Sequence, residues 1–199
     1  MHTEFEPCIG CIPSYDFHPP DTGNGDYIKE VMVREGQVFV DERGFFMESY
    51  NRKRFANEVA PYTFVQDNHS KSSKGVLRGL HYQVEHPQGK LIRCTQGLVY
   101  DIMVDLRKSS STFGKWFGIH LDKPNFQIWV PPGLAHGFYT LSDTAELEYK
   151  TTDYYYPEHE RTLLWNDSQL NIDWELVGNP ILSSKDEEGK LFEECEKYE

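Results

Sequence analysis

Basic residues are scarce in this chain of 199 residues. It contains 20 Lys and Arg against 32 Asp and Glu, which gives a formal net charge of −12 at pH 7. Nucleic acids and anionic membrane surfaces are bound through clustered Lys and Arg side chains. The composition therefore argues against a nucleic-acid or membrane partner, whereas a small anion can still bind where a few basic side chains converge.

Long apolar runs are also absent. No stretch approaches the roughly 20 apolar residues that a membrane-spanning helix needs, and the N-terminus lacks the basic and then apolar layout of a signal peptide. We therefore expect a cytoplasmic protein. Aromatic residues make up 14% of the chain and supply large buried areas, so a folded domain with one core is predicted.

Cysteine is rare, with four in the chain. Cys94 lies in a strand-like run, Cys195 lies near the C-terminus, and Cys8 and Cys11 form a CxxC pair. Half of a zinc site can look like this, but no second CxxC or suitably spaced Cys/His pair follows. The spacing favours reduced thiols, and we expect no bound metal.

Residues 1–27 are rich in Pro and Gly and show no apolar periodicity. Such a composition is typical of an extended segment, so we predict an N-terminal arm that is disordered or lies on a partner subunit. Residues 28–199 have the length of one domain.

The rest of the chain reads as many short strands separated by turn residues. They cover residues 37–40, 45–50, 63–66, 76–82, 91–95, 98–106, 116–121, 127–130, 137–141 and 145–154. Only residues 52–60 and the tail after residue 184 have a helical character. Short strands at this spacing predict an all-β sandwich, jelly roll or barrel.

The run from Gly75 to Gln83 contains Arg78 and His81 on one predicted strand. Side chains alternate along a strand, so these two point to opposite faces unless a bulge intervenes, and Gly79 is where a bulge would fit. A bulge would direct both into one cavity. An arginine can hold an anion there, and histidine is the side chain whose ordinary pKa lies nearest to neutrality.

The strand at 98–106 has a continuous apolar face made by its even-numbered residues, which we expect to build the core. Asp101 lies on the other face, where a carboxylate meets either solvent or a polar cavity. The Pro- and Gly-rich turn at 131–137 places His136 at the start of the next strand.

Together these segments offer a set of groups for acid/base chemistry next to a carbonyl. The members are Arg78, His81, Lys90, Asp101, His136, Tyr149, Tyr155 and Asp186. A histidine on a carboxylate can remove a proton, a cation can stabilise the resulting oxyanion, and a phenol can return a proton on the opposite side. Each member taken singly could instead be structural.

Several runs make the chain resemble the dTDP-4-dehydrorhamnose 3,5-epimerase family. They are Asp41–Glu48, Phe64–Ser70, Gly75–Gln83, Pro87–Arg93, Val104–Ser109, Thr112–Trp116, Ile128–Gly137, Tyr149–Tyr155 and Leu182–Asp186, in the family's order. The resemblance implies a cupin-type jelly roll with a few short helices, a homodimer, and no cofactor. It also implies inversion of C3 and C5 of dTDP-4-keto-6-deoxyglucose.

The resemblance also implies residue roles. His81 corresponds to the general base and Asp186 to its carboxylate partner. Lys90 corresponds to the cation at the C4 oxygen, and Tyr155 to the acid on the other face of the sugar.

Further positions correspond to substrate contacts. Arg78 matches the diphosphate contact, Tyr149 lines the pocket, and His136 and Asp101 support the site. Gln66 and Asn68 match nucleotide-side contacts. Arg43, Phe46 and Glu48 belong to a segment that crosses to the neighbouring subunit in the family.

Three alternatives remain open at this point. A relative that inverts only C3 or only C5 would share these motifs. A metal-dependent cupin usually has a second histidine two residues after the first, where this chain has Gln83. A non-catalytic sugar-nucleotide binder would have no chemical need for the complete set of His81, Lys90, Tyr155 and Asp186.

Overall fold

The computed structural model describes residues 16–21 and 27–199. Most of the expected N-terminal arm, including Cys8 and Cys11, lies outside these residues, so the arm stays a prediction. The described part packs on its own protomer. Phe17 is buried edge-on against Phe55, and His18 exchanges two backbone hydrogen bonds with Val33.

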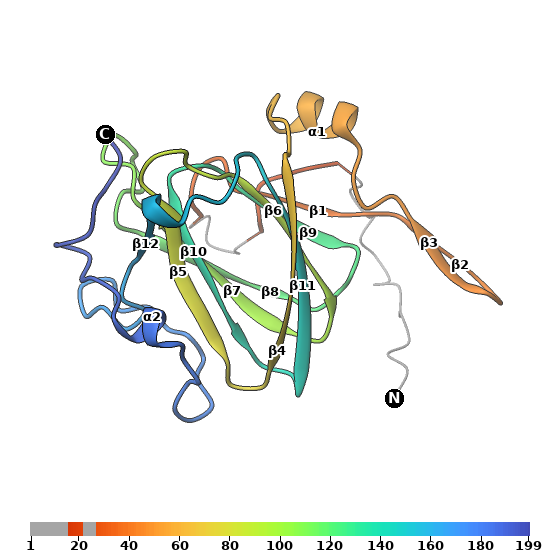
Figure 1. Ribbon diagram of the computed structural model, residues 1–199. Coiled ribbons are helices and arrows are strands. Elements are labelled where there is room, and N and C mark those ends of the chain that lie inside the picture. Colours follow the sequence, from red (N-terminus) through yellow and green to blue (C-terminus); the bar gives the residue numbers. More distant parts are fainter. Residues whose placement is uncertain (1–15, 22–26) are drawn as a thin grey trace.

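The described chain is built mainly from antiparallel strands (Figure 1). The strands are β1 (Met32–Glu35), β2 (Val38–Asp41), β3 (Gly44–Met47), β4 (Gln66–Ser73), β5 (Leu77–Gln83), β6 (Lys90–Gln96), β7 (Val99–Asp105), β8 (Trp116–Leu121), β9 (Phe126–Val130), β10 (Leu134–Thr140), β11 (Thr144–Thr151) and β12 (Glu160–Thr162). The helices are α1 (Arg52–Glu58), the 3₁₀-helix η1 (Pro157–His159) and α2 (Ser184–Glu187).

The strands form two five-stranded sheets that share one core. The first sheet has the order β1-β9-β6-β11-β4, and the second has the order β12-β5-β10-β7-β8. Apart from β7 and β8, strands that are adjacent in the two sheets are not consecutive in sequence, as in a jelly roll. The prediction of an all-β jelly roll with a few short helices is confirmed.

Residues from both sheets fill the space between them. Ile92, Ile128 and Leu147 of the first sheet pack with Met103 and Phe138 of the second. Burying one such side chain contributes about 1.5–3 kcal/mol. This core closes one part of the space between the sheets and leaves the other part as a cavity.

Strand β7 is buried on both faces, which corrects the sequence interpretation. Its even-numbered residues, including Ile102 and Val104, pack outward under the C-terminal segment with Leu163, Trp174 and Phe192. Met103, on the other face, joins the core between the sheets. The apolar alternation was predicted correctly. The C-terminal segment, however, packs on the apolar face and forms a second core, which the local sequence pattern of β7 does not predict.

Several boundaries differ from the sequence prediction. Strand β4 begins at Gln66, where the predicted strand at 63–66 ends. All eight of its residues are polar, so no apolar alternation marks it. The short strands β1 and β12 escaped prediction. The tail after residue 184 is helical only in α2, which ends at Glu187.

The β2–β3 hairpin projects from the body of the protein (Figure 1). Its apolar side chains are exposed, with Val40 at 70% and Phe46 at 72% of their accessible surface. The longest described helix, α1, has seven residues, which is far short of a membrane span.

Candidate active site

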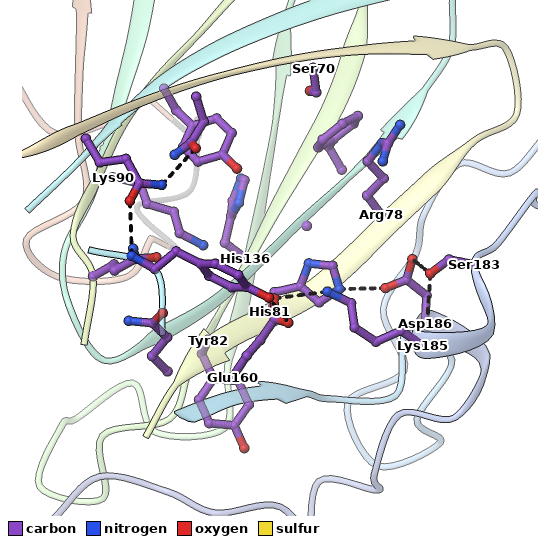
Figure 2. Close-up of a pocket in the computed structure, with 18 residues that line it drawn as sticks. Ser70, Arg78, His81, Tyr82, Lys90, His136, Glu160, Ser183, Lys185 and Asp186 are labelled. Atoms are coloured by element: carbon purple, nitrogen blue, oxygen red, sulfur yellow. Dashed lines mark hydrogen bonds and ion pairs between the residues drawn. The ribbon is translucent and has the colours of Figure 1, made fainter. Parts of the chain in front are cut away.

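A cavity of about 410 Å³ opens between the two sheets (Figure 2). Nine of the residues expected at the site line it, namely Gln66, Asn68, Arg78, His81, Lys90, His136, Tyr149, Tyr155 and Asp186. They come from strands β4, β5, β6, β10 and β11, from the loop after β11, and from α2. The fold therefore brings together residues that are up to 120 positions apart in the sequence.

A bulge in β5 turns Arg78 and His81 to the same side. His81 pairs with His136, and Arg78 pairs with Phe138, so two residues of β5 oppose the single Gly137 of β10. Gly79 has a φ of +121°, and its peptide bond to Leu80 is cis. Leu77 and Leu80 pack into the second core, under the C-terminal segment, while Arg78 and His81 line the cavity. The bulge expected at Gly79 is present.

His81 and Asp186 form a short hydrogen bond across 105 residues of sequence. Nε2 of His81 lies 2.6 Å from Oδ1 of Asp186. A carboxylate only accepts, so Nε2 carries the proton of the neutral ring and Nδ1 is left as the basic atom. Figure 2 shows the same carboxylate joined to Ser183, whose hydroxyl donates to Oδ2 at 2.7 Å.

The pKa of Asp186 lies below its ordinary value. Burial alone would raise this pKa, but hydrogen bonds from His81 and Ser183 and the backbone N–H of Gly79 together outweigh it. The carboxylate therefore stays ionised and can stabilise a positive charge on the histidine ring.

Lys90 places an ammonium group in the cavity. Burial lowers its pKa from 10.5 to about 8, while the negative charges of Asp101 and Glu160 counteract the loss. The lysine is therefore a cation at neutral pH in surroundings where its charge is poorly solvated. Such a cation interacts strongly with a negative charge that develops next to it.

His136 stands on a buried carboxylate beside Lys90. Its Nε2 lies 3.0 and 2.8 Å from the two oxygens of Asp101, which is completely buried. Burial lowers the pKa of His136, although Asp101 counteracts this shift. Asp101 thus lies in a polar interior site, the alternative that its position on β7 left open, and it supports His136 from behind the cavity wall.

Two tyrosines reach the cavity from different places. Tyr149 lies on β11, in the sheet opposite His81, and packs against the core between the sheets. Burial raises its pKa. Tyr155 lies on the loop after β11 and is 48% exposed, and its hydroxyl donates to Glu160 at 3.0 Å. Burial and this hydrogen bond raise its pKa as well.

Polar side chains of β4 face the cavity next to Arg78. Nε of Arg78 donates to the hydroxyl of Ser72 at 3.0 Å, which fixes the guanidinium at the cavity wall. Gln66 donates to Asn68 at 2.9 Å. This side of the cavity offers hydrogen-bonding groups and one positive charge, as an anionic ligand with polar substituents requires.

Three expected residues are not brought to the cavity within this protomer. Arg43 and Phe46 lie on the projecting hairpin, where Arg43 pairs with Asp41. Glu48 follows the hairpin and faces Arg34 and Arg54. Because the hairpin projects away from the body of the protein, Arg43 and Phe46 do not line the cavity of their own protomer.

Sequence reasoning missed Glu160, Ser183 and Lys185, which also line the cavity. Ser183 and Lys185 flank the recognised Asp186, so their place in that run was a usable signal. Glu160 lies on a strand of three residues without a motif, and only the pairing of β12 with β5 brings it to the site.

Gln83 occupies the position at which a metal-dependent cupin usually has a histidine, and its side chain forms hydrogen bonds with backbone groups. Its side chain donates to the carbonyl oxygens of His86 and Tyr154 and accepts from the N–H of Tyr156. In the part of the chain that the structure describes, no group of three or more His, Cys, Asp or Glu residues is placed to hold a metal ion.

Comparison with known proteins identifies close relatives. The family model described as dTDP-4-dehydrorhamnose 3,5-epimerase matches residues 26–194. The enzyme of that name from Pseudomonas aeruginosa is 54% identical over 173 residues, which cover 86% of this chain and 96% of the relative. The one from Methanothermobacter thermautotrophicus is 45% identical over 170 residues, covering 84% and 92%.

Solved structures agree with these relatives. The dTDP-6-deoxy-D-glucose-3,5-epimerase of Legionella pneumophila, in complex with dTDP-4-keto-L-rhamnose, superposes with a TM-score of 0.83 at 47% identity and covers 86% of this chain and 92% of its own. ChmJ, a 3'-monoepimerase from Streptomyces bikiniensis in complex with dTDP-quinovose, superposes with a TM-score of 0.77 at 30% identity, covering 82% and 84%.

Proposed function

The chain belongs to the dTDP-4-dehydrorhamnose 3,5-epimerase family, and we propose that the cavity between its sheets carries out the family's reaction. The protein is an epimerase that inverts C3 and C5 of dTDP-4-keto-6-deoxyglucose. The product is dTDP-4-keto-rhamnose, the precursor of dTDP-rhamnose. The residue roles that follow are proposals built on the geometry of the cavity.

His81 is the general base. Its Nδ1 removes the proton from the carbon next to the C4 ketone, and the Asp186 carboxylate stabilises the positive charge that the ring acquires. Lys90 lies on the same cavity and provides the cation for the enolate oxygen at C4. A preorganised charge of this kind contributes about 3 kcal/mol or more to the transition state.

Tyr149 is better placed than Tyr155 to return the proton. Inversion requires an acid on the face of the sugar opposite to the base, and Tyr149 projects from the sheet that faces His81. The raised pKa of Tyr149 keeps its phenol protonated until it acts. Tyr155, to which the sequence resemblance gave this role, has its hydroxyl bound to Glu160 at the cavity mouth.

The same groups can serve both carbon centres. The C4 ketone acidifies the protons at C3 and C5 equally well in principle, because either carbanion delocalises onto the same oxygen. One base, one cation and one acid therefore suffice for two inversions, provided that the base and acid exchange protons with water between the steps.

The substrate is bound by polar side chains of the cavity wall and by residues of a second protomer. Arg78 holds the diphosphate by charge-assisted hydrogen bonds, and Gln66 and Asn68 contact the nucleotide side. We further propose a homodimer in which the hairpin residues Arg43 and Phe46, together with Glu48, complete the partner's site. The exposed apolar surface of the hairpin supports this arrangement.

In this proposal residues 28–199 form a single epimerase domain, residues 1–27 form an arm, and the enzyme works in the cytoplasm without a metal or cofactor. Prolonged treatment with a chelator should leave turnover unchanged. Activity that is lost and then returns with zinc, iron or manganese would instead indicate a metal-dependent enzyme.

The observation that carries the proposal is the His81–Asp186 pair facing Lys90 and Tyr149 across one cavity. The test is proton NMR of the product formed from dTDP-4-keto-6-deoxyglucose in heavy water. Deuterium at both C3 and C5 is expected. Deuterium at C3 alone would favour the second candidate, a single-centre epimerase, which the similarity to ChmJ brings into consideration.

A further inference from the structure

Glu160 is the meeting point of two side chains at the cavity mouth. Its Oε2 accepts a hydrogen bond from the Tyr155 hydroxyl at 3.0 Å, and its Oε1 accepts one from the Lys185 ammonium at 3.0 Å. The Glu160 side chain is 17% exposed, whereas that of Lys185 is 49% exposed. Both oxygens of the carboxylate are therefore engaged by groups that border the opening.

These contacts join elements that are otherwise separate. The backbone N–H of Tyr155 donates to Gln66 on β4, at the edge of the first sheet, at 3.1 Å. Glu160 lies on β12, at the edge of the second sheet. Tyr155 thus bridges the open side between the sheets, fixed at one end by Gln66 and at the other by Glu160.

The second contact reaches the helix that carries the partner of the base. Lys185 directly precedes Asp186 in α2, so its ion pair with Glu160 ties this helix to β12. Strand β12 in turn pairs with β5, with Thr162 opposite His81. Figure 2 shows Glu160 and Lys185 close to the His81–Asp186 pair.

We propose that Glu160 is a positioning residue, which holds the Tyr155 ring and the Lys185 ammonium in place at the mouth so that the substrate enters a preformed opening. This inference rests on the proposed function, because it concerns how that substrate is received. Glu160 acts through its two neighbours and takes no part in proton transfer.

The physical basis is preorganisation. Tyr155 is half exposed, and without its acceptor the ring would sample several rotamers that binding must then select. The long Lys185 side chain has even more rotational freedom. Fixing both side chains before the substrate arrives lowers the entropic cost of binding. Loss of Glu160 should therefore raise KM and weaken the affinity for the nucleotide.

The test compares Glu160→Ala with Glu160→Gln, with and without Tyr155→Phe. At pH 6, where Lys90 stays protonated even without the nearby charge of Glu160, Glu160→Ala should raise KM roughly three- to tenfold and leave kcat within about twofold. Glu160→Gln keeps one acceptor oxygen for the Tyr155 hydroxyl but loses the ion pair with Lys185, so it should recover part of the loss. In the Tyr155→Phe background the alanine substitution should have a smaller effect, because one of its two targets is already released.

Glu187→Gln is the matched control, since Glu187 is an exposed acid on the same helix as Lys185 and lies outside the cavity lining. It should leave KM unchanged. Calorimetric titration with dTDP makes the test independent of turnover, because Glu160→Ala should weaken dTDP binding even if the wild-type protein turns over no ketosugar.

Three results would overturn the inference. An unchanged KM and dTDP affinity in folded Glu160→Ala would remove the positioning role. A fall in kcat of a hundredfold at constant KM would make Glu160 part of the chemistry. Equal KM losses for Glu160→Ala with and without the Tyr155 hydroxyl, combined with no rescue by glutamine, would show that it does not act through Tyr155.

Discussion

At the scale of single residues, the site contains a poorly solvated cation, Lys90, and two histidines that are each hydrogen-bonded to a carboxylate. His81 is hydrogen-bonded to Asp186, and His136 is hydrogen-bonded to Asp101. The negative charges of Asp101 and Glu160 stabilise the Lys90 ammonium. The carboxylates fix which ring nitrogen carries the proton, and they keep the cations from being too costly to bury.

Lys90 should set the alkaline limit of activity. In the proposed mechanism its ammonium form stabilises the enolate. Because burial lowers the pKa of Lys90 to about 8, that form is lost as pH rises through about 8. We expect kcat/KM to fall above this pH. Lys90→Ala should reduce kcat by about 10²-fold or more.

Lys90→Arg provides the control for this assignment, because a guanidinium stays protonated throughout the accessible range. Whatever activity remains in that variant should persist above pH 8. A pH profile of kcat/KM with the same alkaline limb in both proteins would assign the limb to another group.

The two tyrosines should respond differently to removal of their hydroxyls. Tyr149→Phe should exchange substrate protons for deuterium, since His81 and Lys90 are intact, yet fail to complete inversion. Tyr155→Phe should mainly raise KM. NMR in heavy water, which follows exchange and epimer formation together, distinguishes the cases. The opposite pattern would restore Tyr155 as the acid.

At the scale of elements, the bulge in β5 decides whether Arg78 and His81 share a face. It depends on glycine at one position. A Cβ on Gly79 would lie 2.5 Å from the Cα of Gly137 and 2.8 Å from the carbonyl oxygen of His136. These are backbone atoms of the neighbouring strand, which cannot move aside without opening the β5–β10 pairing.

Gly79→Ala should therefore destabilise the fold by at least about 2 kcal/mol and remove activity. Gly178→Ala is the matched control, because Gly178 also has a positive φ, +82°, but has no atom within 4 Å of an added Cβ. It should cost only the roughly 1–2 kcal/mol of the left-handed backbone. Thermal and urea unfolding of the two variants give the comparison, and equal losses would show that crowding against β10 does not matter.

The sequence predicted the elements with apolar alternation and the motifs with glycine or proline, and it predicted little else. Strand β8 was bounded correctly, and the bulge at Gly79 followed from the need to turn two side chains together. Strand β4 was misplaced because its polar residues face a cavity on one side. Glu160 was missed because its position depends on pairing between distant segments.

At the scale of the whole molecule, the C-terminal segment contributes both to the core and to the site. It covers the outer face of the second sheet through Trp174 and Phe192, and it delivers Asp186 to His81. The β2–β3 hairpin points away from the body, with its aromatic side chains exposed (Figure 1). The cavity of one protomer therefore holds the groups that we propose to be catalytic, but the hairpin of the same protomer does not line it.

Mixed dimers should test that assignment. In the proposed dimer, Arg43→Ala inactivates the site of the partner and His81→Ala inactivates its own site, so a hybrid of the two chains has one site that lacks both defects. Activity should reappear on mixing inactive homodimers under conditions where subunits exchange. Exchange without recovery, or an active species that light scattering shows to be monomeric, would refute a shared site.

The hydrogen bond between His81 and Asp186 spans 105 residues, and this separation fixes when the site comes into existence during synthesis. Translation proceeds at about 5–20 residues per second, so the base emerges from the ribosome several seconds or more before its partner has been made. A chain that stops between residues 90 and 185 has the histidine and the lysine but no Asp186 carboxylate to hold the ring. In the proposed mechanism such a truncated chain has no oriented base, so we expect it to show no turnover.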